Sequence, residues 1–167
     1  FKKLSPEDQA RFEESRNSEG LGLLHVKAVR VMTVEESLQF EREHPECVVD
    51  SLWVDRWKPV DDGEICKSRW CVVGWQDPDI HEIERSSPMP MDLTTNMVAM
   101  IIAMRHWKLT FRDVKKAFGQ SMPSNRRRKL ACRQPRTGMF PTCTDYRQLI
   151  CLETEVYGLV SGPAWWR

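Results

Sequence analysis

One carboxylate, Asp113, follows a segment whose pattern predicts a buried face. Residues 107–112 alternate Trp, Leu and Phe with Lys, Thr and Arg, as in a half-buried strand, and Asp113 continues the apolar face. A buried carboxylate is costly unless a donor, a cation or a metal meets it. Mg²⁺ prefers oxygen ligands and is commonly held by one or two carboxylates together with substrate phosphates. The pattern therefore predicts a Mg²⁺ (or Mn²⁺) ligand at Asp113, and the alternative is an Asp that caps the next turn or helix.

Two cations, Lys67 and Arg69, lie two residues apart in a predicted β-hairpin. Residues 48–58 and 65–75 are predicted to be its strands, because the Asp-Gly pair in the turn at 59–63 is typical of hairpins. Side chains two residues apart in a strand project from one face about 6.6 Å apart. This spacing would let Lys67 and Arg69 hold neighbouring phosphates of a triphosphate, Arg through its planar fork and Lys as a point charge. The alternative is a solvated hairpin edge.

The densest basic run lies at residues 125–129. Its cations can neutralise several phosphates with an affinity that depends on salt and not on sequence; they are Arg126, Arg127, Arg128 and Lys129. A solvated loop explains the run equally well. The formal net charge of the whole chain is only +1, so binding to nucleic acid has to be judged from local clusters of this kind.

The composition bounds the class of protein. A chain of 167 residues is long enough for one domain with a core, or for part of a larger domain. Its six cysteines contain no Cys-x-x-Cys pair, so they predict no zinc site. There is no run of 18 apolar residues. We therefore expect no membrane partner, and an intracellular protein, cytoplasmic or nuclear, with reduced thiols.

The remaining elements predict an α+β fold. A capping-box pattern at Thr33 starts one helix, and Asp92 is predicted to cap another whose apolar circumference indicates burial. Methionines in the second helix are expected to fill the core. The predicted elements are a helix over 6–16 that breaks across 17–20, a strand over 23–32, a helix from 34 that ends before Pro45, a helix over 93–105 and a strand over 147–156.

Residues 111–118, Phe-Arg-Asp-Val-Lys-Lys-Ala-Phe, resemble the first catalytic motif of reverse transcriptases of copia-type (Pseudoviridae-like) retrotransposons. That motif has an Asp followed by Val-Lys, a variable residue and Ala-Phe. The resemblance implies that Asp113 is a catalytic, metal-binding carboxylate and that Val114 offers its backbone carbonyl to the metal. It also implies that Phe118 lies under the sugar of the incoming nucleotide and discriminates against ribose. The family has Leu and then Gly after this Phe, whereas this chain has Gly119 and Gln120.

Further motifs follow the same family in order. Residues 67–75 are similar to its Lys-Ala-Arg-Leu-Val-Ala-Arg-Gly-Phe hairpin, with Val73 where a basic residue is usual, which implies that Lys67 and Arg69 hold the triphosphate. Residues 86–88 and 131–138 are similar to its Phe-Ser-Pro-Val and Gln-Pro-x-Gly segments, and we expect a structural role for 131–138. Residues 157–166 resemble its Tyr-Gly-Leu-Lys-Gln-Ser-Pro-Arg-x-Trp segment. This last likeness implies that Tyr157 and Gly158 contact the nucleotide, and Gly162 and Pro163 the template.

The resemblance implies the fingers and first part of the palm of a right-hand polymerase, with an antiparallel sheet, packed helices and an incomplete fold. We expect an N-terminal extension (helix-strand-helix) at 1–49 and the reverse transcriptase part at 50–167. The function implied is RNA-directed DNA polymerisation by two-metal nucleotidyl transfer. The partners implied are an RNA or DNA template with primer, dNTP, and the integrase and RNase H of a polyprotein. The family's Tyr/Phe-x-Asp-Asp motif does not occur in the 167 residues, so we expect the isolated chain to be inactive. The alternatives are a non-catalytic nucleic-acid-binding module and a decayed relic.

Overall fold

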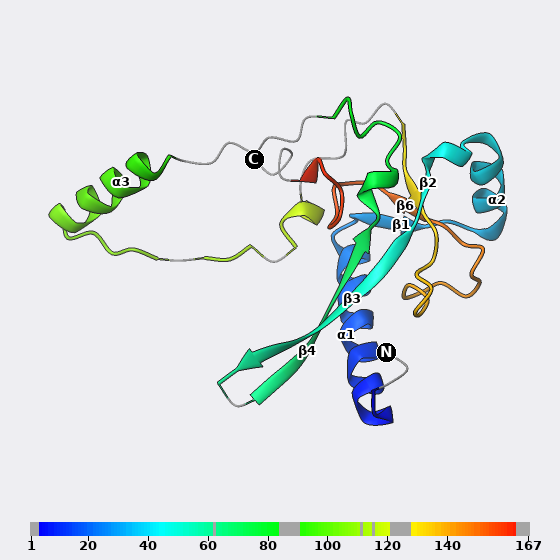
Figure 1. The fold of residues 1–167 in the computed structure, drawn as a ribbon, viewed down its shortest axis with the longest axis horizontal. Helices are drawn as coiled ribbons and strands as arrows, with labels where there is room; N and C mark the ends of the chain where they lie inside the picture. Colours follow the sequence, from blue (N-terminus) through cyan, green and yellow to red (C-terminus); the bar gives the residue numbers. More distant parts are fainter. Residues whose placement is uncertain are drawn as a thin grey trace.

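The computed structural model describes residues 4–61, 63–83, 91–110, 112–114, 116–120 and 128–162. Their mixture of helices and strands confirms the α+β class (Figure 1). The helices are α1 (Pro6–His25), α2 (Val34–Glu43) and α3 (Asp92–Met104), with short 3₁₀ turns η1 (Pro45–Cys47), η2 (Gly74–Gln76) and η3 (Phe118–Gln120). The strands are β1 (Val29–Val31), β2 (Val48–Val49), β3 (Ser51–Val60), β4 (Gly63–Val72), β5 (Ala131–Cys132) and β6 (Ile150–Leu152).

Helix α1 is longer than the sequence predicts. It starts as expected, with the Ser5 side chain accepting a hydrogen bond from the backbone N–H of Asp8. The predicted break at 17–20 is wrong, because Gly20 is buried inside the helix. A Cβ at Gly20 would lie 2.6 Å from Cδ of Pro141, so this glycine permits close packing and does not end the helix. The strand predicted over 23–32 is consequently reduced to β1.

The predicted hairpin is confirmed as β3 and β4. They pair antiparallel from Ser51 opposite Val72 to Val60 opposite Gly63, so the strands reach further toward the turn than predicted. The inner face of the hairpin packs on α1 (Figure 1), and Asp55 on this face forms an ion pair with the buried Arg16 of α1. The outer face is largely exposed.

The second sheet has the strand order β1-β6-β5-β2. Its pairs β1–β6 and β6–β5 are antiparallel, but β2–β5 is parallel. The predicted antiparallel pairing thus holds for β1–β6 and β6–β5 but not for β2–β5, because β2 leads into the hairpin and the chain returns as β5 in the same direction. The strand predicted over 147–156 is restricted to β6. Strands β1 and β2, from the expected N-terminal extension, share this sheet with β5 and β6; the division at 49/50 itself stays a prediction.

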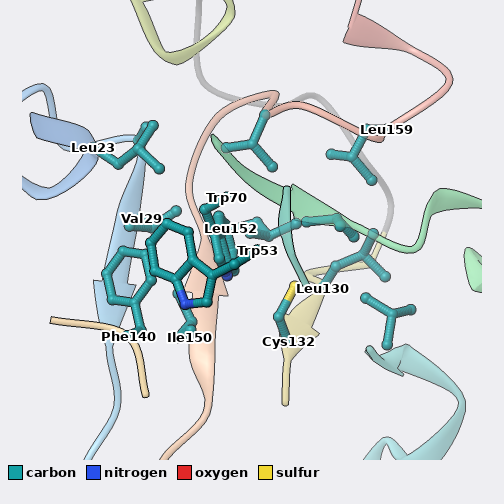
Figure 2. Packing of buried hydrophobic residues seen from close by; sticks show 14 of the residues in the cluster. Leu23, Val29, Trp53, Trp70, Leu130, Cys132, Phe140, Ile150, Leu152 and Leu159 are labelled. Carbon is teal, nitrogen blue, oxygen red and sulfur yellow. The ribbon is translucent and has the colours of Figure 1, made fainter. Parts of the chain in front are cut away.

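The core lies where the base of the hairpin meets this sheet (Figure 2). Trp70 is completely buried and meets Phe140 edge-on, with ring centroids 5.1 Å apart. Trp53 stacks nearly parallel on Phe140 at 6.1 Å. Ile150 and Cys132 from the sheet belong to the same cluster. The three aromatic rings thus join both strands of the hairpin to the loop at 140.

Helix α3 forms over the predicted residues, but the prediction that it is buried is wrong. Its N-cap is Met91, without a side-chain cap bond, and Met104 is 76% exposed. The helix lies apart from both sheets (Figure 1), so no element among the described residues covers its apolar surface. The apolar circumference indicated burial, which requires a covering element that a helix sequence alone does not reveal. No helix in the described ranges is long and apolar enough to cross a membrane.

Candidate nucleotide and nucleic-acid site

The Tyr157–Gly158 turn is docked on the end of β4. The backbone N–H of Val72 donates to the carbonyl of Tyr157 at 2.8 Å. Gly158 has a φ of +99°, and a Cβ there would lie 2.0 Å from the carbonyl oxygen of Val72. A Cβ on Gly74 would lie 2.0 Å from the carbonyl oxygen of Gly158. Two glycines therefore let two backbone segments touch, which no other residue type permits at this φ.

Arg69 and Tyr157 meet at this junction. The guanidinium carbon of Arg69 lies 5.2 Å from the centroid of the Tyr157 ring, within the range of a cation–π contact. The structure thus brings together two predicted nucleotide-binding segments that are far apart in the sequence. Lys67 lies on the same outer face of β4, exposed and two residues closer to the tip of the hairpin.

The strand predicted over 107–112 is not formed in its described residues. Trp107 is 63% exposed and Leu109 58% exposed, so the alternating pattern buries no face. Asp113 is exposed as well, which corrects the prediction of a carboxylate on a buried face. The pattern described an extended chain, but a strand also needs a partner, and the described residues of this segment pair with neither sheet. Phe111 lies outside the described residues.

The C-terminal end of this motif is anchored. The ammonium of Lys116 donates to a carboxylate oxygen and to the backbone carbonyl of Glu19, each at 2.9 Å. Phe118 begins η3, and the following Gly119 is buried with Ala28 beside it. The hydroxyl of Thr154 donates to the Gly119 carbonyl at 3.5 Å. The motif therefore ends beside the segment that leads to Tyr157, while Asp113 and Val114 lie outside this anchored part and are exposed.

A complete metal site is not formed by the residues that the structure describes. They contain no cluster of three or more His, Cys, Asp or Glu side chains placed to hold a metal ion. The exposed Asp113 thus offers a carboxylate outside any such cluster. The described residues do not fit a two-metal centre by themselves, and the Mg²⁺ or Mn²⁺ role of Asp113 and Val114 stays a prediction.

The described part of the basic run is close to acids. Arg128 lies 3.8 Å from a carboxylate oxygen of Glu46 and 3.9 Å from one of Asp79. Lys129 lies 3.8 Å from Glu153. These contacts partly neutralise the two cations, so their role in binding nucleic acid stays a prediction. Gly162 is buried, and Arg126, Arg127, Pro163 and residues 86–88 lie outside the described residues.

Two further cations lie on the outer face of the hairpin, and the sequence motifs did not predict them as site residues. Arg56 lies directly opposite Lys67 in the ladder, and Lys58 lies opposite Ile65. Both side chains are exposed. They have the same two-residue spacing as Lys67 and Arg69, so aligning the two strands from the Asp-Gly turn would have found them.

A groove of about 590 Å³ lies at the base of the hairpin. Its lining includes Leu52, Val73, Arg136 and Tyr146. Residues 131–138, which contain Arg136, were expected from the sequence to have only a structural role. Among the described residues Arg136 has no ion-pair partner, whereas Arg133 pairs with Glu41 at 2.7 Å.

The turn that contains Asp145 and Arg147 provides a pH-dependent prediction. Hydrogen bonds from Arg147 lower the pKa of Asp145 from 3.8 to about 2. Because the folded pKa is depressed, this carboxylate contributes stability above about pH 3.8 and loses the contribution as the pH falls toward 2. We expect an NMR titration of Asp145 to show a midpoint near 2, and Arg147→Gln to return it toward 3.8. Arg136→Gln should leave the midpoint near 2; an unchanged midpoint in Arg147→Gln would contradict the assignment.

Comparison with known proteins identifies no relative of this chain. No protein family, curated protein or solved structure matches this chain. The functional assignment therefore rests on the motifs and on how the fold arranges them.

Proposed function

We propose that this chain is the fingers and first part of the palm of a copia-type reverse transcriptase, an RNA-directed DNA polymerase. In this proposal it binds a primer annealed to an RNA or DNA template and takes up dNTP. Lys67 and Arg69 hold the triphosphate, while Tyr157 and Gly158 lie beside the base. Asp113 is the proposed metal-binding carboxylate, and the rest of the metal site requires side chains beyond those that the structure describes.

The contact between Arg69 and Tyr157 carries the proposal. The family resemblance implies that both residues serve the incoming nucleotide, but it places them in separate motifs. Their side chains meet at 5.2 Å where the Tyr157–Gly158 turn is hydrogen-bonded to Val72. The aromatic ring orients the Arg69 guanidinium without neutralising it, so all its charge remains available to a phosphate.

Binding of dNTP tests this proposal directly. We expect Arg69→Gln to weaken dTTP binding by about tenfold or more, because a hydrogen bond to a charged group contributes roughly 1.5–3 kcal/mol. Tyr157→Ala should weaken it as well, because Arg69 would lose the ring that orients its guanidinium. Isothermal titration calorimetry with Mg²⁺ present would measure the Kd. Arg42→Gln is the matched control, since Arg42 is an exposed cation on α2, away from the hairpin. Equal Kd values for wild type, Arg69→Gln and Tyr157→Ala would contradict the proposal.

The second candidate function is nucleic-acid binding without catalysis. It is favoured by one observation: Asp113 is exposed and belongs to no metal-ligating cluster among the described residues. Such a module would bind a primer–template duplex without a metal requirement. Its affinity would be indifferent to Asp113→Asn.

A further inference from the structure

The outer face of the β3–β4 hairpin carries four cations and, over the described ladder, no acid. Arg56 and Lys58 come from β3, and Lys67 and Arg69 from β4. The strand acids Asp55 and Glu64 are on the inner face, because side chains alternate between faces. All four cations are exposed. Within the described part of the chain none of them has an ion-pair partner, and Arg69 has its contact with Tyr157.

This arrangement places like charges against each other. Arg56 and Lys67 are directly opposite across the strands, and directly opposed like charges destabilise a sheet. An acid at either position would convert the repulsion into attraction, yet both positions are basic. The repulsion would be relieved by an anion bound on this face.

The shape of the cationic surface indicates the kind of anion. The four cations occupy three successive residue pairs of one face: Arg69 on the first, Arg56 with Lys67 on the second and Lys58 on the third. At the usual strand rise these pairs are about 6.6 Å apart, so the surface extends over about 13 Å. A single pair of cations is enough for a triphosphate. A surface of this length suits a chain of repeating phosphates.

We propose that this outer face binds the phosphate backbone of a single-stranded polynucleotide, with Arg56 and Lys58 holding the strand beside the Lys67–Arg69 pair that the proposed function assigns to the triphosphate. Leu52, Val60 and Ile65 lie on the same face and are each more than 40% exposed. Unpaired bases can contact such aliphatic side chains, whereas a duplex keeps its base faces stacked inside. The inference deepens the proposed function, on which the choice of nucleic acid as the anion rests, but it requires no catalysis.

The salt dependence of binding provides the first test. Fluorescence anisotropy with a labelled oligo(dT) 20-mer is measured over a series of salt concentrations. Each phosphate contact in a single strand contributes about 0.7 to the slope of log K against log salt concentration. We expect Arg56→Gln/Lys58→Gln to reduce this slope by about 1.4. Arg42→Gln/Arg105→Gln removes two exposed cations elsewhere and should leave the slope unchanged. A wild-type slope in Arg56→Gln/Lys58→Gln would overturn the proposal.

A charge reversal separates binding from folding. Arg56→Glu places an acid opposite Lys67, so its urea midpoint should equal or exceed that of the wild type while oligo(dT) binding falls. If binding does not fall, the proposal is overturned. Equal competition by polyglutamate would overturn the assignment to a polynucleotide. A loss of duplex binding in Arg56→Glu as large as the loss of oligo(dT) binding would overturn the assignment to a single strand. If oligo(dT) binding does not fall in Arg56→Glu but dTTP binding falls in Tyr157→Ala, the proposed function stands without this surface. If oligo(dT) binding falls but dTTP binding does not, the proposed nucleotide site is overturned and this surface is retained.

Discussion

Replacing Asp55 with alanine should lower the free energy of unfolding by about 3–5 kcal/mol, the usual cost of removing one partner from a buried ion pair. The Arg16 side chain is only 7% exposed and pairs with Asp55, which is itself 17% exposed. The Ser68 hydroxyl also donates to Asp55, at 2.8 Å. The substitution would therefore leave a buried guanidinium between α1 and the hairpin without its carboxylate, with a hydrogen bond to the Thr137 carbonyl remaining. Urea unfolding monitored by tryptophan fluorescence would measure the loss.

Two variants control for this effect. Glu41→Ala removes a partner from the exposed Arg133–Glu41 pair, and surface pairs are worth only about 0–1 kcal/mol. Arg16→Met/Asp55→Leu replaces both charges with apolar groups of similar size, which is often neutral for a buried pair. We expect this double variant to be clearly more stable than Asp55→Ala. An Asp55→Ala protein as stable as the wild type would show that the ion pair does not hold α1 to the hairpin.

Replacing Gly158 with alanine should cost on the order of 4 kcal/mol, in the range reserved for severe local disruptions. The new Cβ would lie 2.0 Å from the carbonyl oxygen of Val72, and the φ of +99° adds strain. The turn that holds Tyr157 would have to leave β4. We therefore expect Gly158→Ala to weaken dTTP binding together with stability, because Arg69 would lose its contact with the Tyr157 ring.

Gly63 offers a matched control for this substitution. It also has a positive φ, +130°, but a Cβ there would meet no atom within 4 Å. Gly63→Ala should therefore lower the free energy of unfolding only by the backbone strain, roughly 1–3 kcal/mol, and dTTP binding should persist. Equal effects of the two substitutions would mean that backbone strain, and not the close approach to Val72, causes the loss of stability in Gly158→Ala.

The sequence predicts best those elements whose signals are local. The Asp-Gly turn located the hairpin, and the capping box of Thr33 and Glu36 located α2, where both reciprocal hydrogen bonds form. Predictions failed where tertiary packing decides. Gly20 continues α1 because Pro141 packs against it, and the alternating segment before Asp113 finds no partner strand. The parallel β2–β5 pair joins residues that no local pattern relates.

The candidate site was predictable in part. Lys67 and Arg69 were recognisable from their spacing, and Tyr157 from the resemblance of its motif. The contact between Arg69 and Tyr157 depends on Gly74 and Gly158 allowing two backbones to touch, which sequence spacing does not show. The contact of Lys116 with Glu19 joins a side chain of the Asp113 motif to the N-terminal helix, and it was not anticipated because long-range ion pairs leave no periodic signal.

Primer extension tests the central proposal, that Asp113 is the metal-binding catalytic carboxylate of a polymerase. The encoded protein, with any residues encoded after Arg167, would be assayed for dTTP incorporation on poly(rA)/oligo(dT) with Mg²⁺. Circular dichroism and duplex binding would establish that each variant is folded. We expect incorporation by the wild type and none by Asp113→Asn, with duplex binding retained. A folded wild-type protein that binds the duplex without incorporating dTTP, or incorporation that survives Asp113→Asn, would contradict the claim.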